Sequence, residues 1–215
     1  IACAAAGIIS GNLAVSGLGI KISSIIIAAS GGIPIVALVL TMFTAIVLGM
    51  GLPTTAAYLI LATVVAPSLA ELGVPLLTAH MFVFFFGCVS TITPPVALAS
   101  YVAAGIADAD INKVGWTAFS YGITAFVLPF MFFFGPALLL DGSLAEIALA
   151  VASGLLGVFL VASAVVGFLN QSHSQMIRMA LFIAGLCLLL QGLLTDLVGL
   201  AIVLIFMFAA KLRRN

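Results

Sequence analysis

Two short segments contain residues whose types and spacing are suited to binding an ion or a small solute. The first runs from Gly49 to Thr55 and reads Gly-Met-Gly-Leu-Pro-Thr-Thr, and the second runs from Ser90 to Pro95 and reads Ser-Thr-Ile-Thr-Pro-Pro. Each interrupts an apolar run where a spanning helix should be most regular. Lipid cannot satisfy the backbone groups that such a break exposes, so broken helix at membrane depth is buried in protein or lines a cavity. Two breaks therefore predict a binding site for a small solute and its coupling ions.

The chemistry at these breaks suits a sodium ion and an anion. Sodium is a hard cation that takes oxygen ligands, and unwound backbone supplies carbonyl oxygens without burying a full charge. Glycines allow the backbone to turn outwards and to approach an ion closely. The half-helices that begin near Thr54 and Pro95 each point a positive dipole end at the site, which favours a carboxylate as guest.

We predict one set of binding residues from these arguments. The substrate- or ion-binding residues are Gly49, Gly51, Pro53, Thr54, Thr55, Ser90, Thr91, Thr93, Pro94 and Pro95, and the candidate sodium ligands among them are Gly49, Gly51, Thr55 and Thr93. The alternative is that glycine and proline merely kink packed helices.

Other chemistries find little support in the chain. Between residues 33 and 106 the only charged residue is Glu71, in a predicted turn, which disfavours coupling by a buried proton-carrying carboxylate. We find no nucleophile–base pair, metal-ligand cluster, P-loop or basic nucleic-acid patch. An enzyme, a cofactor and a nucleic-acid partner are therefore not expected.

The composition predicts a polytopic membrane protein of the all-α class. Hydrophobic residues make up 65% of the 215 residues and charged residues 6%. A soluble domain carries roughly 25% charged residues, and a soluble surface cannot be built without them. The lipid bilayer is thus the expected surrounding of a transmembrane helical bundle.

Segment lengths predict how the two breaks sit in the membrane. Residues 33–48 and 55–69, with the break between them, cover ~55 Å of helix. A single span needs only ~30 Å, and each half falls short of ~20 residues. We therefore predict a re-entrant helical hairpin with the first break at its tip; two short spans are the alternative. Residues 78–89 and 96–106 are too short to span separately and predict one discontinuous helix, unwound where Thr93-Pro94-Pro95 excludes regular helix.

The rest of the chain supplies a check on this arrangement. We predict a polar loop at 108–113, full spans at 115–140 and 144–169, a capping box of Ser143 and Glu146, and shorter helices at 176–190 and 197–210. With a hairpin and one discontinuous crossing, five basic residues fall on one side of the membrane and only Lys21 falls on the other. This is the positive-inside pattern, with the basic side cytoplasmic. The five residues are Lys113, Arg178, Lys211, Arg213 and Arg214.

Two longer runs resemble a known transporter family. Residues 48–61 (Leu-Gly-Met-Gly-Leu-Pro-Thr-Thr-Ala-Ala-Tyr-Leu-Ile-Leu) and residues 93–107 (Thr-Pro-Pro-Val-Ala-Leu-Ala-Ser-Tyr-Val-Ala-Ala-Gly-Ile-Ala) are similar to second-half signatures of the large membrane subunit of TRAP transporters, the DctM-like permeases. The Gly-Met-Gly-Leu-Pro-Thr-Thr form is closest to fused permeases that work with TAXI-type binding proteins. The resemblance covers about residues 1–142.

The resemblance implies a function. It implies a multi-pass, elevator-type, sodium-driven symporter of a bacterial or archaeal cytoplasmic (inner) membrane. A periplasmic binding protein of the TAXI type would deliver an organic acid anion, a dicarboxylate or a related carboxylate. In the family the hairpin tip and the unwound crossing coordinate sodium and substrate. These roles carry over to Gly49, Gly51, Thr54, Thr55, Thr93, Pro94 and Pro95.

The resemblance also suggests how the chain is organised. Residues 1–142 are expected to be the C-terminal half of a permease transport domain, and residues 143–215 a C-terminal transmembrane helical extension without a motif-based role. Because the chain starts with Ile1 inside an apolar run, we expect a C-terminal fragment whose partners include an N-terminal permease half and small-subunit helices. The competing hypothesis is a non-transporting membrane scaffold or assembly subunit.

Overall fold

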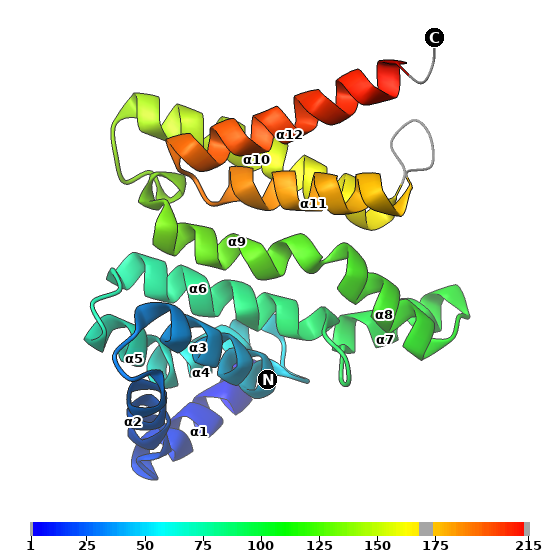
Figure 1. Ribbon diagram of the computed structural model, residues 1–215. Coiled ribbons are helices and arrows are strands. Elements are labelled where there is room, and N and C mark those ends of the chain that lie inside the picture. Colours follow the sequence, from blue (N-terminus) through cyan, green and yellow to red (C-terminus); the bar gives the residue numbers. More distant parts are fainter. Residues whose placement is uncertain (1, 168–173, 213–215) are drawn as a thin grey trace. The chain divides into compact units, whose positions relative to one another are not determined.

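The computed structural model describes residues 2–167 and 174–212, and every regular element in this part of the chain is a helix (Figure 1). This confirms the predicted all-α class. The chain divides into two compact units, residues 1–130 and 131–215, and the division falls within helix α9 (Ile123–Phe134). Each unit is described by itself below. Arg213 and Arg214 lie outside the described residues.

The first unit contains the two predicted breaks. Its helices are α1 (Ala2–Val15), α2 (Leu18–Ser30), α3 (Pro34–Gly49), α4 (Thr54–Val64), α5 (Ala66–Glu71), α6 (Leu76–Val89), the 3₁₀ turn η1 (Ser90–Ile92), α7 (Leu98–Ala107), α8 (Ile111–Tyr121) and the first part of α9. The first break separates α3 from α4, and the second separates η1 from α7, as the sequence predicted.

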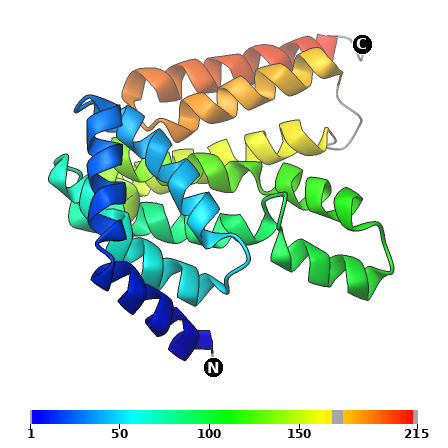
Figure 2. The ribbon, with the colours of Figure 1, turned by 90° about the horizontal axis from the view of Figure 1, so that it is seen from below.

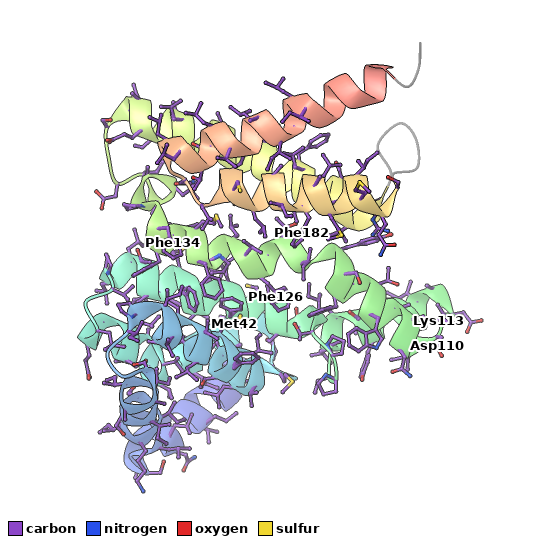
Figure 3. All side chains as sticks on the ribbon, viewed as in Figure 1. Met42, Asp110, Lys113, Phe126, Phe134 and Phe182 are labelled. Carbon is purple, nitrogen blue, oxygen red and sulfur yellow. The ribbon has the colours of Figure 1, made fainter. Side chains whose placement is uncertain are left out.

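Helix α6 lies at the centre of this unit. It packs against α3, α4 and α5. Phe82 and Phe86 are completely buried. Between centroids, the ring of Phe82 lies 5.2 Å from that of Phe130, and the ring of Phe86 lies 6.2 Å from that of Phe126, which Figure 3 labels on α9. These aromatic rings fix α6 to α9 through burial and edge-to-face contacts. Helix α6, the first half of the predicted discontinuous helix, is therefore anchored by these contacts.

Helices α7 and α8 form a hairpin that extends away from α3, α4 and α6 in both views (Figures 1 and 2). Asp110 and Lys113 lie at its turn (Figure 3), and the Asp110 carboxylate accepts a hydrogen bond of 2.9 Å from the Lys113 amide. This N-cap starts α8 at Ile111. The predicted loop at 108–113 was therefore too long, because Asn112 and Lys113 already belong to a helix.

The second unit is a bundle of three helices that follows a short 3₁₀ segment, η2 (Pro136–Leu139). Helix α10 (Leu144–Val166) packs against α11 (Gln175–Leu189), which packs against α12 (Leu193–Leu212), and the three lie side by side in both views (Figures 1 and 2). The predicted capping box of Ser143 and Glu146 is present in full. The last helix starts earlier than the predicted residue 197.

Length and composition single out few full membrane spans. Within the described residues, two helical stretches qualify, Ile111–Phe134 and Leu144–Val166, and a third is added if the pair Gly7–Leu13 and Leu18–Ser30, bent by 66°, is one span. The first of these corrects the predicted span at 115–140. The helical stretch starts at Ile111 and ends at Phe134, and the 3₁₀ segment begins at Pro136. Helices α3, α4, α7 and α6 with η1 are apolar but have only 10–17 residues.

Candidate functional site

The first break is an exposed tip. Helix α3 ends at Gly49, Met50 is extended, Gly51 has a left-handed φ of +77°, and α4 begins at Thr54. Gly51 is one place where the conformation requires glycine, since a side chain at this φ is strained. The N-cap Pro53 offers no capping side chain, so the first amides of α4 have no side-chain partner there. Gly51, Pro53, Thr54 and Thr55 are all exposed.

The second break is less exposed than the first: Ser90 and Thr93 are buried, and Pro95 is exposed. After η1, Thr93 is extended with φ −96° and ψ 121°, as expected for a residue before proline. Ala97 then adopts a left-handed conformation, φ +37° and ψ 52°, before α7 begins at Leu98. The Tyr101 hydroxyl reaches back and donates a hydrogen bond of 2.5 Å to the Pro95 carbonyl. The chain thus changes direction between Thr93 and Ala97, and the helix restarts beyond it.

Three hydroxyls line up along the second break and all donate backwards. Ser90 Oγ donates to the Gly87 carbonyl, Thr91 Oγ1 to the Cys88 carbonyl and Thr93 Oγ1 to the Val89 carbonyl, each at 2.7 Å. A hydroxyl oxygen whose proton is used in this way keeps its lone pairs for a further partner. These oxygens are therefore oriented as acceptors and as potential cation ligands.

The fold brings the two breaks into contact. Gly49 is buried against Ser90, so closely that a Cβ atom added to Gly49 would lie 2.6 Å from Ser90 Oγ and 3.1 Å from Ser90 Cβ. A Cβ added to Gly51 would lie 3.6 Å from Val96 Cγ1. Thr54 and Thr55 are not part of the Gly49–Ser90 contact and stay exposed at the start of α4. The structure therefore joins one part of the predicted set and leaves the tip threonines at its surface.

A small cavity adjoins the second break. Its volume is about 190 Å³, and it lies between the restarting helix α7 and helix α8. The predicted residues Pro94 and Pro95 form part of its wall. The complete lining is Pro94, Pro95, Ala97, Tyr101, Ile111, Asn112, Gly115 and Trp116.

Comparison with known proteins identifies the family. The model of the family "Tripartite ATP-independent periplasmic transporter, DctM component" matches residues 1–147, which include both breaks. The chain belongs to this family. No curated protein and no solved structure matches the chain significantly. The DctM component is the inner-membrane permease of a TRAP transporter and not an enzyme, and it works with a periplasmic substrate-binding protein and the other TRAP subunits.

The first unit of this DctM permease also has features that sequence reasoning missed. Ala97 has a left-handed backbone conformation that an alanine gives no hint of. Thr41 and Ser100 are buried, and their hydroxyl oxygens have no hydrogen-bond partner. No sequence pattern marks them, because burial and missing partners depend on how the helices pack.

Proposed function

We propose that this DctM permease imports an organic acid anion, a dicarboxylate or a related carboxylate, together with sodium ions. One observation carries the proposal, namely the contact of Gly49 with Ser90 that joins the hairpin tip to the unwound crossing. Two helix breaks that meet in one place fit a shared binding site better than two independent kinks. A non-transporting scaffold has no need for such a meeting point.

The acceptor oxygens support sodium as the coupling ion. In this proposal Gly49, Gly51, Thr55 and Thr93 contribute to sodium binding, and Ser90 and Thr91 stand beside them. The hydroxyls of the second break already donate to backbone carbonyls, so their lone pairs are directed to a cation. Oxygen-only ligation of this kind suits a hard cation.

The starts of the half-helices support an anionic substrate. Pro53, Thr54 and Thr55 lie at the N-terminus of α4, and Pro94 and Pro95 precede the N-terminus of α7. Helix N-termini present free amides and a positive dipole end, which attract a carboxylate. We propose that a periplasmic binding protein of the TAXI type delivers this substrate.

We further propose an architecture for the membrane. Residues 33–69 would form a re-entrant hairpin, residues 78–106 a discontinuous crossing, and both would move as parts of an elevator-type transport domain. Residues 1–142 belong to that domain and residues 143–215 form a C-terminal transmembrane extension. Support comes from the lengths of α3, α4, α6 and α7, each too short for an ordinary span.

Cysteine labelling in intact cells tests this topology. With single cysteines, Glu71→Cys is expected to react with an impermeant reagent from the periplasmic side and Asn112→Cys only from the cytoplasmic side. Both native side chains are exposed in the structure, so burial does not prevent labelling. Asp141→Cys, on the periplasmic side in this topology, is the matched control. Labelling of Glu71→Cys and Asn112→Cys from the same side would contradict the single discontinuous crossing of residues 78–106.

Threonine variants test the sodium site in the complete transporter. We expect Thr55→Ala and Thr93→Ala to raise the sodium concentration for half-maximal uptake about tenfold, since each removes one oxygen ligand worth roughly 1.4 kcal/mol. The measurement is radiolabelled uptake into proteoliposomes with the loaded binding protein, at varied sodium concentration.

Thr117→Ala is the control for these variants, because Thr117 is an α8 threonine that also donates to its own helix, at 2.7 Å to the Lys113 carbonyl. It should leave the sodium dependence unchanged. If both site variants behaved like Thr117→Ala, the sodium assignment would be wrong. Absence of any sodium-dependent uptake by the wild-type transporter would favour the scaffold hypothesis.

A further inference from the structure

Ser100 is unusual among the buried serines. It lies in the first turn of α7 and is 3% exposed, and its Oγ has no hydrogen-bond partner. Every other serine that is buried in the described residues donates its hydroxyl proton to a backbone carbonyl. These are Ser23, Ser30, Ser68, Ser90 and Ser163.

The break explains why Ser100 lacks a partner. A helical serine usually bonds to the carbonyl three or four residues earlier. For Ser100 these positions fall at Val96 and Ala97, where the helix is interrupted and Ala97 is left-handed. The Ala97 carbonyl accepts the Tyr101 amide instead, at 3.0 Å. A buried hydroxyl without a partner costs free energy, so such groups call for an explanation.

The same turn also presents unused backbone donors. Helix α7 has ten residues, and the amides of Leu98, Ala99 and Ser100 precede its first intrahelical hydrogen bond. The N-cap Ala97 has no side chain that can bond to them. Because Cα–Cβ bonds in a helix tilt towards its N-terminus, the Ser100 side chain points back to the level of these amides. The hydroxyl and the amides therefore lie at the same end of α7.

We propose that Ser100 and the first-turn amides of α7 form a subsite for one carboxylate group of the transported anion. This proposal rests on the proposed function and adds a residue outside the predicted set. Ser100 would donate its hydroxyl proton to a carboxylate oxygen, while the helix N-terminus supplies amides and a favourable dipole. Ala97 and Tyr101, on either side of the turn that holds Ser100, line the 190 Å³ cavity, in which the rest of a small anion would lie.

Substrate binding to the Ser100→Ala variant tests the subsite. The purified complete transporter is titrated with succinate in sodium chloride, and binding is followed by calorimetry. We expect the Kd for succinate to rise about tenfold, because a hydrogen bond to a charged group is lost. Melting temperature without succinate and sodium affinity should both be retained, since removing an unpaired buried hydroxyl breaks no contact within the protein. Ser100→Thr, which keeps the hydroxyl, should retain most of the succinate affinity.

Ser68→Ala is the matched control. Ser68 is equally buried but donates to the Val65 carbonyl at 2.6 Å, so its loss should lower the melting temperature and leave the succinate Kd unchanged. A wild-type Kd in Ser100→Ala would overturn the subsite while leaving the sodium-coupled function standing. If the wild-type transporter bound neither succinate nor acetate, the proposed function would fail, and the subsite with it.

Discussion

Gly49→Ala is expected to abolish most sodium-driven uptake. The added methyl group would lie 2.6 Å from Ser90 Oγ, closer than real Cβ atoms approach other atoms, and 3.1 Å from Ser90 Cβ, which is tighter than most Cβ contacts. Gly49 and Ser90 are both buried and tightly packed, so the break between α3 and α4 has to move away from the break that precedes α7. Overpacking costs of about 1–3 kcal/mol correspond to a roughly 5- to 150-fold loss of the closed arrangement. Uptake in proteoliposomes at saturating sodium measures this loss.

Two further variants separate this steric effect from a general loss of stability. Gly105→Ala places a methyl group on α7 where no atom lies within 4 Å, so transport should be preserved. Gly49→Ala combined with Ser90→Ala removes the 2.6 Å contact and leaves the 3.1 Å one, so its melting temperature should recover towards the wild-type value. Its uptake should stay low, because the Ser90 hydroxyl of the proposed site is lost as well. If Gly49→Ala transported normally, the two breaks would not need close contact, and the central observation behind the proposed function would lose its force.

Gly185→Ala is expected to be among the most destabilising glycine-to-alanine substitutions in the second unit. Its new methyl group would lie 2.7 Å from Val161 Cγ2, 2.9 Å from the Gly157 carbonyl oxygen and 3.0 Å from the Val161 amide nitrogen. Two of these atoms are backbone atoms of α10, which cannot turn aside as a side chain can. Separating α10 from α11 should cost about 3 kcal/mol or more. Thermal unfolding of the purified protein in detergent measures the change.

Gly154→Ala provides the comparison on the facing helix. The nearest atom to its added methyl group would be Leu138 Cδ2 at 3.6 Å, an ordinary contact. Since alanine favours helix over glycine by roughly 0.5–1 kcal/mol, this variant should be as stable as the wild type or slightly more stable. Equal melting temperatures for the two variants would show that α10 and α11 do not depend on close backbone approach.

Much of the helical layout could be predicted because membrane helices are governed by length and by backbone satisfaction. Proline and glycine placed both breaks correctly, and Ser143 with Glu146 marked the start of α10. Errors arose where a side chain caps a helix. Asp110 starts α8 earlier than its polarity suggested, and Thr195 accepts the Gly192 amide at 2.9 Å and so falls within the first turn of α12. In a sequence, polar residues at the start of a helix are easily interpreted as part of a loop.

The residues at the two breaks could be picked out from the sequence, but their contacts could not. The sequence shows that Gly49 and Ser90 flank separate breaks, yet only packing of α3 on α6 brings them together. It also gives no sign that Ala97 is left-handed or that the Ser100 hydroxyl is unpaired. Both properties depend on how neighbouring helices pack, and the local pattern of apolar residues in the sequence does not reveal this packing.

The backward hydrogen bonds of Ser90, Thr91 and Thr93 divide the site by the sign of charge. With their protons committed to Gly87, Cys88 and Val89, these hydroxyls repel a carboxylate and attract a cation. The helix starts have the opposite preference. Either ion alone would bring an uncompensated charge into a medium of low dielectric, which is costly, whereas the pair enters nearly neutral. In the function proposed above, obligatory co-transport then follows from electrostatics, without any mechanical latch between the two ions.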